Sequence, residues 1–272
     1  MFEYKINNCN LAKQLLSVQT THNIMSVKAP IINSYISVDC VVFGFDGEKL
    51  NVLLVDRTLL DKSTGELQFT DLTLTGNHIF EKEDISEAAN RILFDLTGLT
   101  GIYLNQFSVF AHPDRLKHPN DTKWLLANNR DPDSRIISIG YYSLLASQKV
   151  NLEWKGRNVK WYPVSEIGTL AFDHNKILLD ALTSLRYNLK NEPIGFELLP
   201  TKFTLSQLQK VYEVILGTTL DKRNFRKKIS RMTYLIPLEE KQKSVAHKPA
   251  KLFLFSKDVY EKTKKELFDF SI

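Results

Sequence analysis

The chain has 272 residues, of which 43% are hydrophobic and 11% aromatic, and its formal net charge is +5. This length and apolar content suit one large or two ordinary globular domains and exclude an intrinsically disordered chain. No apolar stretch approaches the roughly 20 residues that a membrane-spanning helix needs. The N-terminal residues lack the apolar core of a signal peptide. Two cysteines, Cys9 and Cys40, are too few for a disulfide framework, so we expect a cytoplasmic protein.

Residues 1–30 form a first segment, for which the pattern predicts a short helix over Leu11–Val18. Tyr35–Phe45 is rich in β-branched and aromatic residues and predicts a strand, and Asp46-Gly47 predicts a hairpin turn into a second strand, Leu50–Val55. Four later segments also have the composition or alternation of strands: Leu72–Thr75, Ile102–Ala111, Arg135–Leu145 and Val159–Tyr162.

Two helices are predicted among these strands. The first begins at Asp84, where Glu87 completes a capping box, and ends at Gly98, a residue type that favours the left-handed C-cap. The second covers Ala171–Arg186, with Asp173 placed to cap it. A polar insertion from about His112 to Asp133 separates two of the strands. Interleaved strands and helices predict an α/β (α+β) sandwich with helices on both faces of a sheet.

The pattern changes beyond a predicted linker at 191–200. A helix over Thr204–Leu216 opens with a capping box, and a second helix, Lys222–Met232, follows with Asp221 as its cap. Two short strands, Tyr234–Pro237 and Lys251–Phe255, flank a basic loop. From Glu197 onward there are 16 Lys and Arg against 9 Asp and Glu, whereas the rest of the chain has 20 against 22. These features predict a small winged helix-turn-helix domain that binds DNA, although a solvated basic surface gives the same charge pattern.

The second helix of such a motif lies in the major groove, so its basic face supplies the predicted contacts with DNA. Arg223, Asn224 and Lys227 are the predicted base-reading residues, because Arg pairs with guanine and Asn with adenine through two hydrogen bonds. The predicted phosphate contacts come from the same helix: Lys222, Arg226, Lys228 and Arg231. Lys243 and Lys248 in the wing loop are predicted to follow either the DNA backbone or the minor groove.

The stretch Gly76–Leu99 resembles the Nudix box, G-x5-E-x7-R-E-U-x-E-E-x-G-U, in which U is a bulky aliphatic residue. Arg91 and Gly98 set the register and place the first acid of the box on Glu83. Nudix hydrolases use three glutamates on the helix of the box to hold Mg²⁺ against a diphosphate. In this chain those three positions are Ile92, Asp95 and Leu96. We therefore predict no metal site, no cofactor and no enzymatic activity.

The whole chain from about residue 35 resembles the Nudix-related transcriptional regulators of the NrtR type, and within them the branch of arabinose-responsive repressors of sugar-utilisation genes. The segments that carry the resemblance are Gly76–Leu99, Arg130–Leu144, Phe172–His174, Pro193–Pro200 and Phe203–Lys228. It implies an effector-binding Nudix-like domain over 31–190 and a DNA-binding domain over 201–272. It also implies a homodimer that binds palindromic operator DNA and releases it when a small molecule occupies the Nudix pocket.

Two effectors fit the resemblance: ADP-ribose, which NrtR-type regulators sense, and a neutral pentose such as L-arabinose. Because the metal-binding acids are missing, we expect the pentose. The predicted ligand-binding residues are polar or aromatic side chains: Arg57, Phe80, His112, Arg135, Tyr141, Asp173 and His174. Each also has an ordinary structural interpretation, with Asp173 as a helix cap, Tyr141 as a core aromatic and His174 as a surface residue. The alternatives are a hydrolase of ADP-ribose or related nucleotide sugars with an appended interaction domain, and a protein–protein module that uses the winged helix without DNA.

Overall fold

The computed structural model describes residues 30–147, 158–242 and 248–263. The helix predicted over Leu11–Val18, Cys9 and Lys243 lie outside the described residues. The chain divides into two units, Met1–Ile31 and Ile32–Ile272, and the second unit is described below. None of the helices in the described ranges has the length and apolar character that a membrane crossing requires.

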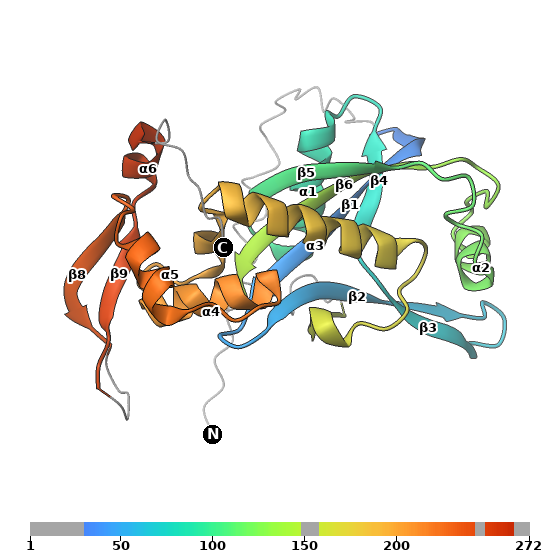
Figure 1. Cartoon of the computed structure of the whole chain (residues 1–272). Coiled ribbons are helices and arrows are strands. Elements are labelled where there is room, and N and C mark those ends of the chain that lie inside the picture. The colour runs from blue at the N-terminus through green and yellow to red at the C-terminus, as the bar shows by residue number, and fades with distance from the viewer. Residues whose placement is uncertain (1–29, 148–157, 243–247, 264–272) are drawn as a thin grey trace, which may run out of the picture. The chain divides into compact units, whose positions relative to one another are not determined.

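A seven-stranded sheet forms the centre of the N-terminal part (Figure 1). Its strands are β1 (Ile32–Phe45), β2 (Leu50–Leu60), β3 (Leu67–Thr73), β4 (Thr75–Phe80), β5 (Tyr103–Phe110), β6 (Ile137–Ala146) and β7 (Val159–Pro163). The main strand order is β3-β2-β1-β6-β5, with β4 paired to β1 and β7 paired to β2. The short strand predicted over Leu72–Thr75 is instead the junction between β3 and β4, because a single residue, Leu74, separates these two strands.

Helices cover both faces of this sheet, which confirms the predicted α/β sandwich. Side chains along a strand alternate between the faces, so Val41 and Phe43 pack under α3 (His174–Asn191), while Cys40 and Val42 pack under α1 (Ile85–Thr97). Cys40 is fully buried, and burial raises the pKa of its thiol.

The ends of α1 match the prediction in detail. Asp84 caps the helix and forms a capping box with Glu87, and Gly98 adopts the left-handed conformation with φ 71°. Arg91, in the middle of the helix, pairs with Glu83: its Nε and Nη2 lie 2.6 Å and 2.8 Å from the two carboxylate oxygens of Glu83. The Glu87 carboxylate is already held by the backbone N–H of Asp84. The first acid of the Nudix-like box therefore joins strand β4 to helix α1.

This ion pair leads to a testable pH dependence of stability. The Arg91 hydrogen bonds lower the pKa of Glu83 in the folded state, whereas the unfolded chain retains the ordinary value of about 4.3. The stabilisation is therefore complete above that value and is lost as the pH falls further. We expect Glu83→Gln to lower the free energy of unfolding by about 1–2 kcal/mol at pH 7 and by progressively less as the pH falls below the unfolded-state pKa. Urea unfolding over this pH range measures this, with Glu87→Gln as the control, since glutamine also completes a capping box.

The strands β1 and β2 separate soon after their hairpin. They pair over three positions only, from Phe43↔Val52 to Phe45↔Leu50, and β1 then pairs with β4. The segment predicted as a polar insertion, His112–Asp133, contains the helix α2 (Pro119–Ala127), which we did not predict. His118 caps α2, and proline occupies its first position, where the missing N–H costs nothing. The helix escaped prediction because its apolar residues form no continuous stripe.

Helix α3 begins at His174 and runs to Asn191, further than predicted. Asp173 stands at the N-cap position but forms no capping hydrogen bond, because its carboxylate binds Arg115 instead. The predicted linker at 191–200 contains the 3-10 turn η4 (Ile194–Leu198), in which Phe196 is buried and stacks on Phe255. Residues 191–200 are therefore packed into the hydrophobic core rather than forming an exposed linker. The predicted domain boundaries remain a prediction.

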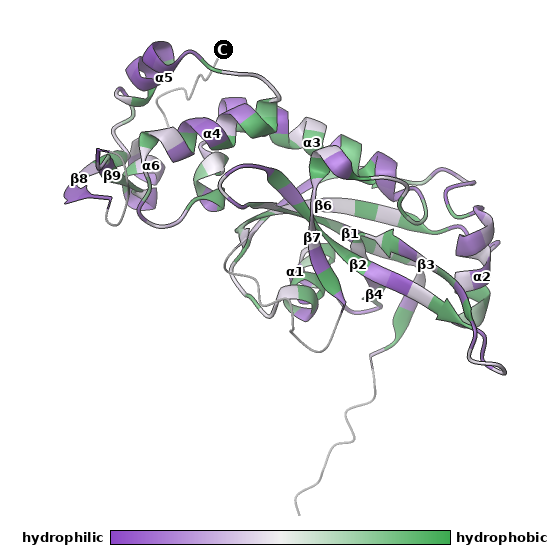
Figure 2. Ribbon diagram, turned by 90° about the horizontal axis from the view of Figure 1, so that it is seen from below, coloured by the Kyte–Doolittle hydropathy of each residue, from purple (hydrophilic) through white to green (hydrophobic). Residues whose placement is uncertain are grey.

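The C-terminal part has the predicted order of elements. Helix α4 (Leu205–Leu216) has the Thr204–Gln207 capping box and ends at a left-handed Gly217. Asp221 caps α5 (Lys222–Ile229), which is shorter than the predicted helix ending at Met232. The remaining elements are the paired strands β8 (Leu235–Lys241) and β9 (Lys251–Phe255) and the helix α6 (Lys257–Thr263). Figure 2 shows α5 (Lys222–Ile229) almost entirely in the hydrophilic colour.

Candidate ligand pocket and nucleic-acid interface

A pocket of about 570 Å³ lies where β1 and β2 diverge. One wall comes from β1 and β4, the other from β2 and the end of β3, and residues of the 112–136 segment and the start of α3 complete it. The lining residues are Ser37, Asp39, Val55, Asp56, Arg57, Thr73, Leu74, Gly76, Asn77, His78, Arg115, Leu116, Trp124, Leu125, Asn128, Arg130, Ile136, Asn158, Phe172 and His174. A pocket of this size accommodates a ligand much larger than a single pentose.

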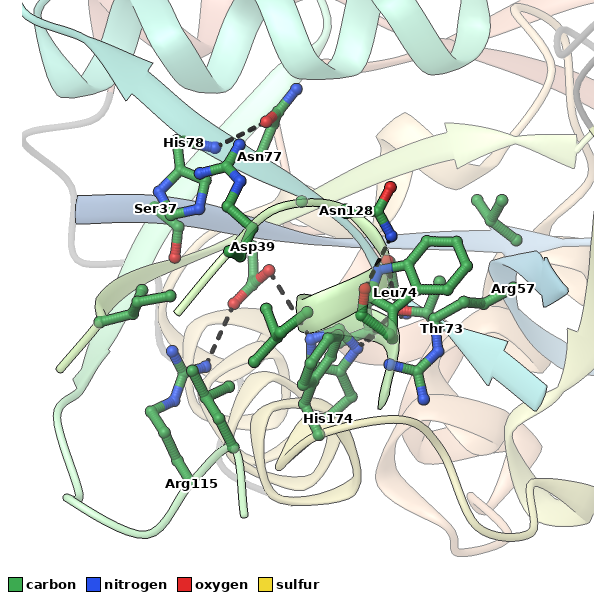
Figure 3. Close-up of a pocket in the computed structure, with 18 of the residues that line it drawn as sticks. Ser37, Asp39, Arg57, Thr73, Leu74, Asn77, His78, Arg115, Asn128 and His174 are labelled. Carbon is green, nitrogen blue, oxygen red and sulfur yellow. Dashed lines mark hydrogen bonds and ion pairs between the residues drawn. The ribbon is translucent and has the colours of Figure 1, made fainter. Parts of the chain in front are cut away.

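Asp39 stands at the centre of a buried polar cluster in this pocket (Figure 3). Its Oδ2 accepts hydrogen bonds from Ser138 Oγ at 2.5 Å and from Arg115 Nη2 at 3.4 Å. Arg115 also binds both carboxylate oxygens of Asp173, at 2.8 Å and 3.0 Å. A Cβ added to Gly76 would lie 2.0 Å from Asp39 Oδ1, so only glycine fits beside this carboxylate. The Asp39 side chain is therefore fixed from several elements at once.

His174 is buried, contrary to the surface position predicted for it. Its Nδ1 accepts a hydrogen bond of 3.0 Å from the backbone N–H of Leu74. The proton of the neutral ring must then be on Nε2, which lies 3.7 Å from Asp39 Oδ1. Burial lowers the pKa of His174 despite the nearby carboxylates. The first residue of α3 thus contributes a neutral imidazole to the pocket.

Arg57 lines the pocket, and its Nε and Nη2 belong to an ion-pair cluster, whereas its buried Nη1 has no hydrogen-bond partner among the described residues. Its Nε and Nη2 donate to Asp71 at 2.7 Å and 2.5 Å, and Nη2 lies 2.7 Å from Asp121 Oδ1. Its guanidinium lies 4.6 Å from the ring centroid of Phe172 and 5.5 Å from that of Trp124. Because two carboxylates compensate its charge, Arg57 acts mainly as a strut that joins β2, β3 and α2.

Arg130 is the lining cation that remains for an anionic ligand. It forms no ion pair with any residue in the described ranges. Its charge acts on His78, whose pKa is lowered first by burial and next by Arg130. The His78 ring is held at 3.2 Å by the carbonyl oxygen of Ile36. This end of the pocket can therefore receive negative charge.

The structure gathers only some of the predicted ligand-binding residues at this pocket. Arg57 and His174 line it, and Asp173 lies directly behind Arg115. The other four are not among its lining residues. Phe80 stacks on Arg91, His112 accepts from the backbone of Asp114, Arg135 binds the carbonyl of Ala111, and Tyr141 packs in the core on the α1 side of the sheet.

Several lining residues were not predicted from the sequence. Asp39 is a charged residue inside an otherwise apolar strand, and this signal could have identified it. Arg115, Trp124 and Arg130 belong to the insertion, whose structure the sequence pattern left undefined. Their contribution depends on the fold of the 112–136 segment over the pocket.

Two of the three metal-binding positions of the Nudix box are part of the hydrophobic core. Ile92 and Leu96 are almost completely buried on the α1 face that packs against the sheet. Within the described residues, no three His, Cys, Asp or Glu side chains are grouped to hold a metal ion. The donor set of this helix does not fit Mg²⁺, because a hard cation requires several oxygen ligands.

The second site is the outer face of α5. Phe225 and Ile229 are buried, whereas Arg223 and Lys227, one turn apart on the opposite side of the helix, are exposed. Four other predicted contacts of this helix and its end are also exposed, namely Lys222, Asn224, Arg226 and Arg231, whereas Lys228 is half-buried. Lys248, in the loop before β9, is exposed as well.

Comparison with known proteins shows which proteins this chain is similar to. The family of NrtR DNA-binding winged helix domains matches residues 195–255. The crystal structure of Shewanella oneidensis NrtR complexed with a 27mer DNA is 25% identical, with a TM-score of 0.66 over 83% of this chain and 95% of that one. The winged helix domain thus matches the NrtR family, and the chain as a whole has the fold of an NrtR-type Nudix regulator. The predicted family and fold are thereby confirmed.

Two further proteins are similar to this chain. The ADPR responsive transcriptional repressor NtrR of Acinetobacter baylyi is 25% identical over 231 residues, which cover 83% of each chain. A MutT/nudix family protein from Enterococcus faecalis shares the fold, with a TM-score of 0.59 at 19% identity over 82% of this chain and 88% of that one. These relatives do not support the predicted arabinose-responsive branch of the NrtR type.

Proposed function

We propose that this NrtR-type regulator is a repressor that binds operator DNA through α5 and releases it when ADP-ribose occupies the pocket. The observation that carries the DNA-binding part is the exposed basic face of α5 on a winged helix of the NrtR class. The proposal includes a homodimer acting on a palindromic operator in the cytoplasm. A duplex selected from a random library, followed by fluorescence anisotropy and analytical ultracentrifugation, tests specific binding and the dimer.

The proposed effector replaces the pentose expected from the sequence. The Acinetobacter baylyi relative is described as responsive to ADPR. The pocket of about 570 Å³ is in the range of nucleotide-sized ligands, and a pentose would leave most of it empty. Aromatic rings of Trp124 and Phe172 line it, as a nucleobase requires, and Arg130 is available for a phosphate.

The loss of the box acids leads to a prediction about metal dependence. Because Ile92 and Leu96 are core residues, we expect ADP-ribose to bind without Mg²⁺ and to be recovered unhydrolysed. At about 100 times its dissociation constant, it should raise the free energy of unfolding by roughly 2.7 kcal/mol, equally in Mg²⁺ and in EDTA. Thermal-shift curves, with L-arabinose as the matched ligand control, measure this. A shift with L-arabinose alone, or one that needs Mg²⁺ and yields AMP, would contradict the proposal.

A further inference from the structure

The Asp39 carboxylate has one oxygen that no hydrogen bond satisfies. Oδ2 is bound by Ser138 and Arg115, but Oδ1 forms no hydrogen bond within 3.5 Å to any described residue. The side chain lines the pocket and is 9% exposed. This oxygen is on a side chain that lines the pocket, so it can accept a hydrogen bond from a donor that a ligand supplies.

The charges around Asp39 define the kind of donor. Arg115 is shared between Asp39 and Asp173, and His174 is held as a neutral ring by the Leu74 N–H. The floor of the pocket therefore has a net negative charge, which disfavours phosphate and favours an uncharged hydroxyl group. Arg130 and His78, by contrast, provide a lining region without an ion-paired acid.

We propose that Asp39 determines effector specificity by accepting hydrogen bonds from the hydroxyl groups of a terminal, unphosphorylated sugar. The inference rests on the proposed function, because it assigns an orientation to ADP-ribose: the terminal ribose lies against Asp39 and the phosphates lie toward Arg130. Gly76 is needed for this contact, since any side chain at position 76 would displace Asp39 Oδ1. A third phosphate in place of the terminal ribose, as in ATP, is rejected by the same carboxylate.

Isothermal titration of the full chain with ADP-ribose and with ATP tests this assignment. We expect Asp39→Asn to weaken ADP-ribose at least 10-fold and to strengthen ATP, so that the preference between the two ligands nearly disappears. Gly76→Ala keeps the charge but moves the carboxylate, and it should weaken ADP-ribose without strengthening ATP. Asp180→Asn is the control: it removes a carboxylate charge outside the pocket, on α3, where Asp180 pairs with Lys176, and should leave the preference unchanged.

The outcomes separate this inference from the proposed function. If wild-type protein binds neither ligand, the proposed effector is wrong and the role of Asp39 fails with it. If wild type binds ADP-ribose but Asp39→Asn weakens ADP-ribose and ATP equally, Asp39 has only a structural role. If Asp39→Asn does not fold, Gly76→Ala decides, because an unchanged affinity for ADP-ribose in that variant contradicts the contact.

Discussion

Replacing Arg57 with methionine is expected to lower the free energy of unfolding by about 3–5 kcal/mol at pH 7. The Arg57 side chain is 3% exposed and the Asp121 side chain beside it 1% exposed. Methionine preserves much of the packing against Phe172 but leaves the charge of Asp121 buried without a counterion. Removing one partner of a buried ion pair costs far more than removing both. Chemical denaturation with guanidinium measures the loss.

The control for this prediction is the double variant Arg57→Met, Asp121→Asn. Asparagine has no charge to leave uncompensated, and its oxygen can still accept the 3.1 Å hydrogen bond that the Phe172 N–H donates to Asp121. We expect the double variant to recover a large part of the lost stability. If Arg57→Met is as stable as wild type, Arg57 does not stabilise the fold through Asp71 and Asp121. Its charge would then be available for an anionic ligand.

The second large effect is expected on DNA binding. Replacing both Arg223 and Lys227 with alanine should lower the affinity for the selected duplex about 10²- to 10³-fold at physiological salt. A bidentate arginine–guanine contact alone contributes about 1–3 kcal/mol of discrimination. Both side chains project from the exposed side of α5, so the fold and the thermal stability should change little. Fluorescence anisotropy at several salt concentrations measures the affinity.

Controls distinguish base reading from general electrostatics. Arg226→Ala removes a predicted phosphate contact and should weaken all duplexes similarly, with a smaller dependence of affinity on salt. Lys176→Ala removes the same charge from α3, where Lys176 pairs with Asp180, and should leave DNA binding unchanged. Full binding by the Arg223→Ala, Lys227→Ala variant would contradict the role of α5 as the recognition helix.

The sequence predicted those features that depend on neighbouring residues. The capping boxes at Asp84 and Thr204, the left-handed glycines Gly98 and Gly217, and the buried pair on α5 all follow from local rules. Such features involve residues three to five positions apart, so their spacing alone carries the information. The order of elements in the winged helix was predictable for the same reason.

The pocket was largely not predictable because it is assembled from distant segments. Asp39 meets Arg115 from 76 residues away, and Arg115 meets Asp173 from 58 residues away. Asp173 has the position and residue type of a helix cap, and only the presence of Arg115 diverts its carboxylate. Tyr141 looked like a ligand-binding aromatic, but the alternation of β6 turns it to the face opposite to the pocket.

Helix α3 joins the ligand pocket to helix α4. His174, its first residue, lines the pocket, and Arg186 in its later turns donates a 2.7 Å hydrogen bond from Nε to the carbonyl oxygen of Ile215 in α4. An α-helix advances about 1.5 Å and turns about 100° with each residue. Inserting one residue between these two positions would thus rotate one attachment by more than a quarter turn relative to the other. Substitutions at the exposed positions of α3 are therefore expected to be tolerated, whereas insertions or deletions within the helix are not.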